Sequence, residues 1–170
     1  YSTVIAVGGD GTVHEVVNGL LRASNEGETI ALGVVPLGNG DDFAKMIPPQ
    51  TPIGGKVFDW RVAVDKIIQG QTKLFDVGRM SDYLLRSEQN NNPHYFMNGM
   101  DIGFGAQAAL NFTKVPSFLT GIAAYLAAIM KTLIDYPIPK VSIQIDDQPA
   151  FEQSTTMTAI TNGRCFGSGF

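Results

Sequence analysis

The sequence has few cysteines, few histidines and no cluster of basic residues, and these scarcities exclude several classes of function. Twelve Lys and Arg against sixteen Asp and Glu give a formal net charge of −4. Nucleic-acid binding and attraction to anionic membranes both need clustered basic charge, so we expect neither a nucleic-acid partner nor a basic membrane patch. Cys165 is the only cysteine, which excludes an internal disulfide and fits a cytoplasmic location. His14 and His94 are isolated, so no zinc-site spacing occurs.

The first 70 residues alternate between short apolar runs and helical patterns. The runs at residues 3–7 and 30–36 predict buried parallel strands, and apolar residues at helical spacing follow the first strand and recur over residues 59–69. A T-x-x-E pattern from Thr12 to Glu15 predicts a capping box at the start of the first helix. This strand–helix–strand–helix order is typical of a parallel sheet covered by helices.

The remainder of the chain predicts mainly strands. The runs K-V-S-I-Q-I-D and T-T-M-T-A-I-T alternate between apolar and polar residues, as half-buried strands do. Asp146 and Asp147 lie between such segments, where we interpret them as turn residues and not as a catalytic pair. We therefore expect two domains, an α/β domain over residues 1–73 and a mostly β domain over residues 74–170.

One apolar stretch in the second part, over about residues 117–135, predicts a helix. Its large side chains fall on one stripe, which contains Phe118, Leu119, Ile122, Tyr125, Leu126, Ile129, Met130 and Leu133. A one-sided stripe predicts a helix that packs on a sheet through that stripe, because a membrane-spanning helix is apolar all round. Attachment at a membrane interface is the alternative.

Two glycine-rich loops follow the two predicted parallel strands. They are Gly8-Gly9-Asp10-Gly11-Thr12 and Gly38-Asn39-Gly40-Asp41-Asp42. Ligands bind at the carboxyl ends of parallel strands, and the start of a helix offers free N–H groups and a positive dipole to phosphate. Neither G-x-x-x-x-G-K-[ST] nor G-x-G-x-x-G occurs, which excludes a P-loop and disfavours a dinucleotide-binding site of the usual kind. The two loops together predict a phosphate site of another kind.

The aspartate in the first loop needs an explanation, because a carboxylate repels phosphate. Asp10 is either a cap or turn residue that accepts hydrogen bonds from backbone amides, or a ligand of Mg²⁺ that bridges to the phosphate oxygens. In the second case Asp42 would share the ion or its water shell. His14, in the first turns of the helix, is either a hydrogen-bond partner of a nucleotide or an ordinary exposed residue.

The segments G-G-D-G-T-V-H-E-V-V-N-G-L and V-V-P-L-G-N-G-D-D-F-A-K resemble the catalytic domain of diacylglycerol kinases and related lipid kinases. Y-F-M-N-G-M-D-I-G-F-G-A and N-G-R-C-F-G-S-G-F extend the resemblance over nearly the whole chain. The resemblance implies part of a phosphofructokinase-like α/β domain and part of a β-sandwich, with transfer of the γ-phosphoryl group of ATP to a lipid hydroxyl, diacylglycerol being favoured. An NAD kinase, which shares Gly-Gly-Asp-Gly-Thr, and a non-catalytic nucleotide-binding relative are the alternatives.

The resemblance also implies roles for individual residues. ATP would contact Gly8, Gly9, Asp10, Gly11, Thr12, Val13, His14 and Asn39. Asp10 would be catalytic, steadying the phosphates together with Mg²⁺, and Asp10 and Asp42 would be the metal residues. Asn39 stands where the family usually has threonine and Asp41 where it has asparagine, so the second loop departs from the usual pattern.

The family pattern extends further than this sequence. A β-α-β segment is expected before the first loop, and the general base and a structural Mg²⁺ site are expected beyond Phe170, so we expect the chain to be a piece of a longer protein. The partners implied are a lipid substrate, met at a membrane surface to which the protein attaches peripherally, and a second copy in a homodimer.

Overall fold

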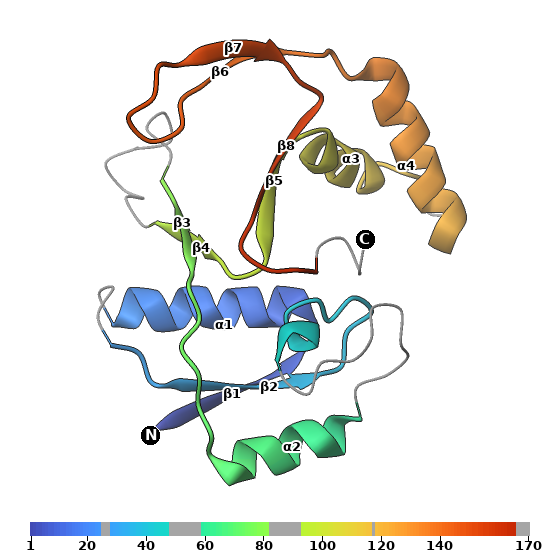
Figure 1. Ribbon diagram of the computed structural model, residues 1–170. Helices are drawn as coiled ribbons and strands as arrows, with labels where there is room; N and C mark the ends of the chain where they lie inside the picture. The colour runs from blue at the N-terminus through green and yellow to red at the C-terminus, as the bar shows by residue number, and fades with distance from the viewer. Residues whose placement is uncertain (25–27, 48–58, 82–92, 117, 166–170) are drawn as a thin grey trace. The chain divides into compact units, whose positions relative to one another are not determined.

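The computed structural model describes residues 1–24, 28–47, 59–81, 93–116 and 118–165 (Figure 1). In this part of the chain there are four α-helices, one 3-10 helix and eight strands paired in four two-stranded sheets. This mixed architecture confirms the α/β character that the sequence predicts. The chain divides into two compact units, Tyr1–Gly99 with Thr161–Phe170, and Met100–Ile160. The predicted domain boundary at residue 73 stays a prediction.

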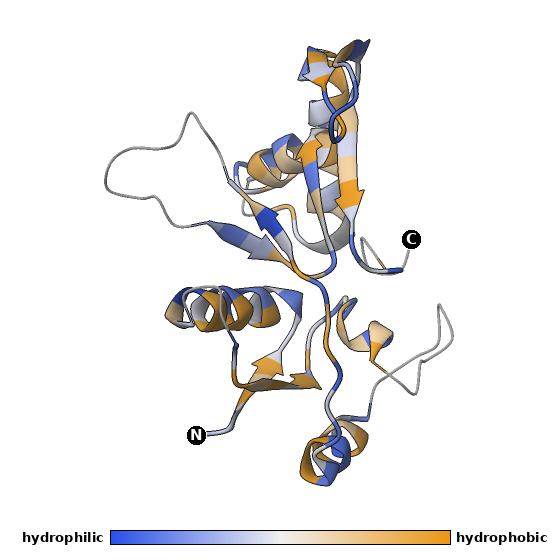
Figure 2. Ribbon diagram, turned by 60° about the vertical axis from the view of Figure 1, so that its left-hand side comes forward, coloured by the Kyte–Doolittle hydropathy of each residue, from blue (hydrophilic) through white to orange (hydrophobic). Residues whose placement is uncertain are grey.

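The first unit begins with two parallel strands and a helix on each face of them (Figure 1). These elements are β1 (Thr3–Gly8), α1 (Asp10–Ala23), β2 (Ala31–Pro36) and α2 (Trp60–Gln69). Both strands are mostly hydrophobic, whereas the two helices have a hydrophobic and a hydrophilic side, as Figure 2 shows. The core on the α1 side contains Ala6, Val13, Val17, Val34, Phe43 and Ala44. The parallel order predicted from the sequence is confirmed.

The two helices begin and end in different ways. At α2 the Asp59 carboxylate accepts a hydrogen bond from the Arg61 N–H (2.9 Å), and Gly70 ends the helix in the left-handed region (φ 68°). At α1 the N-cap is Gly9, without a side-chain cap, and Thr12 is already the third helical residue. The predicted capping box from Thr12 to Glu15 is therefore wrong, because the helix begins three residues earlier than the pattern implies.

A second, antiparallel pair of strands packs on α1. β3 (Gly78–Met80) pairs with β4 (His94–Phe96), and a short 3-10 helix, η1 (Ala44–Met46), follows the second glycine-rich loop. Asn18 of α1 is 3% exposed; its Oδ1 accepts from the Tyr95 N–H (3.0 Å) and its Nδ2 donates to the Tyr95 carbonyl (2.9 Å). The Asn18 side chain thus bonds both the N–H and the carbonyl of one β4 residue, as the backbone of a neighbouring strand does.

The remaining elements are strands and two helices. They are β5 (Gly99–Gly103), α3 (Phe104–Phe112), α4 (Gly121–Asp135), β6 (Lys140–Ile143), β7 (Phe151–Ser154) and β8 (Met157–Thr161). β5 pairs with β8, and β6 and β7 form an antiparallel hairpin. Asp146 and Asp147 lie in the turn of that hairpin, which confirms their interpretation as turn residues. α3 is not predicted from the sequence.

α4 confirms the predicted helix but packs through the other side. Ala124, Ala128 and Thr132, spaced four residues apart, are at most 3% exposed, and α4 packs on α3. Asn111 of α3 donates from Nδ2 to the Thr132 Oγ1 (2.9 Å), and this hydroxyl donates to the Ala128 carbonyl (2.7 Å). Small side chains allow the two helix backbones to approach closely, so the small side of α4 is the buried one.

Five large residues of the predicted stripe are exposed. More than half of the residue surface is accessible at Phe118, Tyr125, Leu126, Met130 and Leu133. The prediction that α4 packs on a sheet through its apolar stripe is therefore wrong in both respects, the partner and the face. Among the described residues, no helix has both the length and the apolar character that a membrane span requires.

Candidate functional site

The two glycine-rich loops lie together at the carboxyl ends of β1 and β2 (Figure 1). Gly8 and Pro36, the last residues of the two strands, lie opposite each other, so the loops leave the sheet side by side. The Leu37 N–H donates to the Gly8 carbonyl (3.1 Å), which extends the pairing of the strands by one more hydrogen bond. The structure thus brings together the two loops that the sequence predicts to share one edge.

The loops touch through two glycines. A Cβ atom added to Gly38 would lie 2.5 Å from the Gly9 Cα, and one added to Gly9 would lie 3.0 Å from the Gly38 Cα. Neither position has room for a side chain as the loops are placed. The glycines are therefore required for the contact between the loops.

Asp10 links the first loop to the second by a hydrogen bond. It is the first residue of α1, where a negative charge interacts favourably with the helix dipole, and its Oδ1 accepts from the Phe43 N–H (3.0 Å). Phe43 precedes η1, so one carboxylate connects the beginnings of two helices. This geometry matches the first interpretation of Asp10, a carboxylate that accepts from a backbone amide, although the amide belongs to the other loop.

The two aspartates of the second loop are also engaged. Asp41 has φ 52°, and its carboxylate oxygens lie 2.9 and 3.1 Å from the Gly38 nitrogen. Burial raises the pKa of Asp41, and the hydrogen bond from Gly38 opposes this effect. Asp42 is buried, and its carboxylate lies 3.0 Å from the Lys45 Nζ. The second loop is held by its own carboxylates.

The two predicted metal residues are engaged by other groups of the protein. In the part of the chain that the structure describes, no group of three or more His, Cys, Asp or Glu side chains is placed to hold an ion. Asp10 and Asp42, the predicted metal residues, bond the Phe43 N–H and the Lys45 ammonium. The metal role of Asp10 and Asp42 stays a prediction.

The other predicted nucleotide residues lie in or beside the first turns of α1. Gly11, Thr12 and His14 are exposed, and so is Asn39 in the second loop. Val13 differs, because its side chain is buried in the core and its N–H donates to the Gly9 carbonyl (3.1 Å). Exposed groups at this edge are placed to meet a ligand, whereas Val13 supports the turn from inside.

The arrangement suits an anion. The first N–H groups of a helix have no partner within the helix, and Gly11 in the first turn of α1 has no atom within 4 Å of the place where a side chain would begin. The side chain of Thr12 lies over Gly8, so a Cβ on Gly8 would come within 2.4 Å of its Oγ1. The chemistry at this edge is therefore that of backbone amides and small polar groups, which bind phosphate well.

Three contributors are not predicted from the sequence. The Phe43 amide and the Lys45 ammonium engage Asp10 and Asp42, and Asn18 holds α1 against β4. A backbone amide has no sequence signal. Asn18 had a sequence signal, because it is a polar residue beside the apolar stripe of α1. Lys45 also had one, because it follows Asp42 at a spacing of three, which allows an ion pair within one helical turn.

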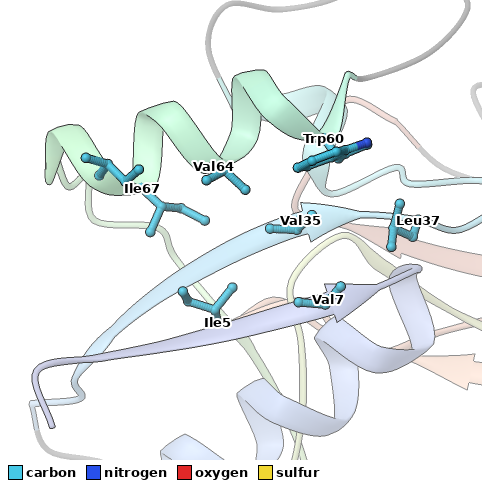
Figure 3. A pocket seen from close by; sticks show the side chains of 8 residues that line it. Ile5, Val7, Val35, Leu37, Trp60, Val64 and Ile67 are labelled. Carbon is cyan, nitrogen blue, oxygen red and sulfur yellow. The ribbon is translucent and has the colours of Figure 1, made fainter.

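The opposite face of the sheet has a cavity of a different character. It has a volume of about 460 Å³ and lies between the parallel strands and α2, as Figure 3 shows. Trp60, Val64 and Ile67 line it from α2, and Ile5 and Val35 from the strands. The lining residues are all apolar, so this cavity offers no partner for a phosphate.

Comparison with known proteins points to one family. Residues 1–80 match the family model described as diacylglycerol kinase catalytic domain. Proteins named diacylglycerol kinase are 33% identical over 150 residues in Staphylococcus epidermidis (86% of this chain, 40% of the relative) and 30% identical over 151 residues in Staphylococcus saprophyticus (87% and 42%). One from Staphylococcus aureus is 33% identical over 131 residues (77% and 34%). The chain spans less than half the length of these relatives, and no solved structure matches it significantly.

Proposed function

We propose that the protein is an ATP-dependent lipid kinase with diacylglycerol as its acceptor, because residues 1–80 match the diacylglycerol kinase catalytic domain family. In this reaction the hydroxyl oxygen of the lipid attacks the γ-phosphorus of ATP, the bond to the β–γ bridging oxygen breaks, and ADP leaves. The hydroxyl proton passes to a general base, which the family resemblance places beyond Phe170. Catalysis of such a transfer depends on positioning and on stabilisation of charge. The observation that carries the proposal is the contact of two glycine-rich loops at the start of α1, within the segment that matches the family.

The proposed ATP site uses backbone groups of the first loop and one side chain of the second. The N–H groups of the first turn of α1 would hold phosphate oxygens, which agrees with their place at a helix N-terminus. Asn39 is exposed on the adjoining loop and has an amide that both donates and accepts, so it would bond the nucleotide. Asp10 would act by holding the second loop in place beside these groups.

Mg²⁺ is part of the proposal only as the companion of ATP. The ion commonly binds through phosphate oxygens, waters and one or two carboxylates. That mode agrees with an edge where Asp10 and Asp42 are already engaged by protein groups. No step of the proposal depends on a metal ligand from the second loop.

The finer architecture and the partners are proposed on the family resemblance. The parallel pair with a helix on each face supports part of a phosphofructokinase-like α/β domain, and the strands after residue 74 are proposed to be part of a β-sandwich. Homodimer formation and peripheral attachment to the cytoplasmic membrane surface are proposed on the resemblance alone. Light scattering and sedimentation with phosphatidylcholine vesicles would test these two points.

Incubation of the full-length protein with labelled ATP and diacylglycerol in mixed micelles tests the proposed function. We expect label in the phosphorylated lipid. Label in NAD instead, when NAD is supplied as the acceptor, would make the protein an NAD kinase. ATP binding without transfer to either acceptor would make it a non-catalytic nucleotide-binding protein.

Two variants at Asp10 test the role of its carboxylate. Asp10→Asn keeps an oxygen that accepts from the Phe43 N–H, whereas Asp10→Ala removes it. We expect the alanine variant to lose at least 100-fold in kcat/KM for ATP and the asparagine variant to lose less than 10-fold, because positioning needs the acceptor and not the charge. Equal losses in both variants would refute this role and make the charge of Asp10 essential.

A further inference from the structure

Asp41 adopts a backbone conformation that few residues tolerate. Its φ of 52° lies in the left-handed region, where among the described residues Asp146 is the only other non-glycine residue. Asp and Asn are the side chains that accept this conformation most readily, because they form local hydrogen bonds. The conformation of Asp41 turns its carboxylate back along the loop, so that both oxygens lie within 3.1 Å of the Gly38 nitrogen.

This hydrogen bond acts at the point where the loops touch. The Gly38 N–H donates a hydrogen bond to the Asp41 carboxylate. Gly38 also lies against Gly9, since a Cβ added to Gly38 would be only 2.5 Å from the Gly9 Cα. The hydrogen bond from the Phe43 N–H to Asp10 joins the loops a few residues further along. Two carboxylates therefore hold the second loop, one within the loop and one across to α1.

We propose that Asp41 is a positioning residue, which holds Gly38 against Gly9 and so keeps Asn39 beside the start of α1. The inference rests on the proposed function, because the ligand met by Asn39 is taken to be ATP. Asp41 acts here through the loop and not by touching the nucleotide. The loop needs a hydrogen-bond acceptor and a residue that tolerates a positive φ, and it does not need a charge.

One substitution at Asp41 separates the acceptor and the backbone conformation from the charge. Asparagine has the same shape, an oxygen in the same place and tolerance of the left-handed region. It is the substitution that keeps every feature that the inference requires.

Three variants separate the two requirements. Asp41→Asn keeps the acceptor and the backbone conformation, Asp41→Gly keeps only the conformation, and Asp41→Ala keeps neither. Asp146 is the matched control, because it is an aspartate with φ 50° in the hairpin turn between β6 and β7. The same three substitutions at Asp146 test for a general effect of changing such a residue.

The measurements use the full-length protein and have two readouts. Amide hydrogen exchange at Gly38, measured without ligand, reports the hydrogen bond itself, and titration with a fluorescent ATP analogue together with KM and kcat for ATP reports positioning. We expect Asp41→Gly and Asp41→Ala to speed exchange at Gly38 and to raise Kd and KM at least 10-fold with a smaller change in kcat. Asp41→Asn and all variants of Asp146 should stay within threefold of the wild type.

Each contrary result has a definite meaning. Wild-type affinity and exchange in Asp41→Gly would overturn the inference, because the acceptor would then hold nothing. A loss in Asp41→Asn as large as in Asp41→Ala would also overturn it, since the charge would then matter. If the wild-type protein binds ATP but phosphorylates no lipid, the proposed function is refuted and the role of Asp41 is not. If the wild-type protein binds no ATP, the proposed function and the role of Asp41 are both refuted, although hydrogen exchange still reports the hydrogen bond to Gly38.

Discussion

Asn18 offers a direct test of what holds α1 in the first unit. Its amide is 3% exposed and bonds both backbone groups of Tyr95, at 3.0 and 2.9 Å. Asn18→Leu keeps the approximate size of the side chain and removes these two hydrogen bonds, together with one from Nδ2 to the His14 carbonyl (2.9 Å). A buried polar group that loses its partner costs about 1–3 kcal/mol, so we expect the free energy of unfolding to fall by about 2–5 kcal/mol.

Asn18→Asp is the more informative partner variant. It keeps an oxygen for the Tyr95 N–H but places a second oxygen where the amide now donates to the Tyr95 carbonyl. At pH 7 the buried carboxylate and the carbonyl repel each other, so this variant should be at least as unstable as Asn18→Leu. Protonation turns the second oxygen into a donor, so the variant should regain stability as the pH falls, a trend that the leucine variant lacks.

Urea denaturation followed by the fluorescence of Trp60 measures both effects. Trp60 is the only tryptophan of these 170 residues and lies in the same compact unit as Asn18. Glu15→Leu, an exposed position on the same helix, is the control and should change the free energy of unfolding by no more than about 0.5 kcal/mol. If Asn18→Leu changes it as little as the control does, the bonds to Tyr95 do not hold α1.

Two further predictions concern other parts of the fold. Gly70→Ala should destabilise the protein by about 1–2 kcal/mol, because a Cβ is unfavourable at φ 68°. Gly19→Ala inside α1 should instead stabilise the protein by about 0.5–1 kcal/mol, because alanine favours the helix and has room there. Thermal denaturation in which both variants shift stability in the same direction would contradict this reasoning. Thr132→Val should lower the free energy of unfolding by about 1–3 kcal/mol, because it removes the hydroxyl between Asn111 and the Ala128 carbonyl. Thr132→Ser keeps the hydroxyl and is the control. If urea denaturation shows the valine variant to be more stable than the serine variant, this hydroxyl does not stabilise the fold.

Local patterns predicted the first unit well. Short apolar runs identified β1 and β2, and apolar residues at helical spacing over residues 59–69 identified α2. The two glycine-rich loops were predicted to share one edge, since parallel strands bring their carboxyl ends together. Each of these predictions needed only neighbouring residues and one rule of topology.

Predictions failed where a partner distant in the sequence decides the outcome. Periodicity showed that α4 has two sides but not which of them is buried, and the choice depends on α3, which approaches closely over Ala124 and Ala128. The capping box failed because Gly9 starts α1 and Thr12 lies over Gly8. In both cases the sequence pattern correctly indicated a helix nearby, but contacts with other segments decided which face is buried and where the helix begins.

The candidate site was predicted in its location but not in its internal bonding. Asp10 was open to two interpretations, and the hydrogen bond from the Phe43 N–H, 33 residues away, became visible only in the structure. Every residue except proline has a backbone N–H, so no pattern of residue types predicts which N–H will bond Asp10. Asp41 and Asp42 similarly depend on how the second loop folds back on itself.

The contact between Gly9 and Gly38 limits how this site can change by mutation. Most contacts in proteins are adjustable, because a larger or smaller side chain can tune the distance between two segments. Here backbone lies against backbone, and any first substitution at either glycine forces the loops apart. Variation at this edge is therefore confined to the neighbouring exposed side chains, among them Asn39 on the second loop.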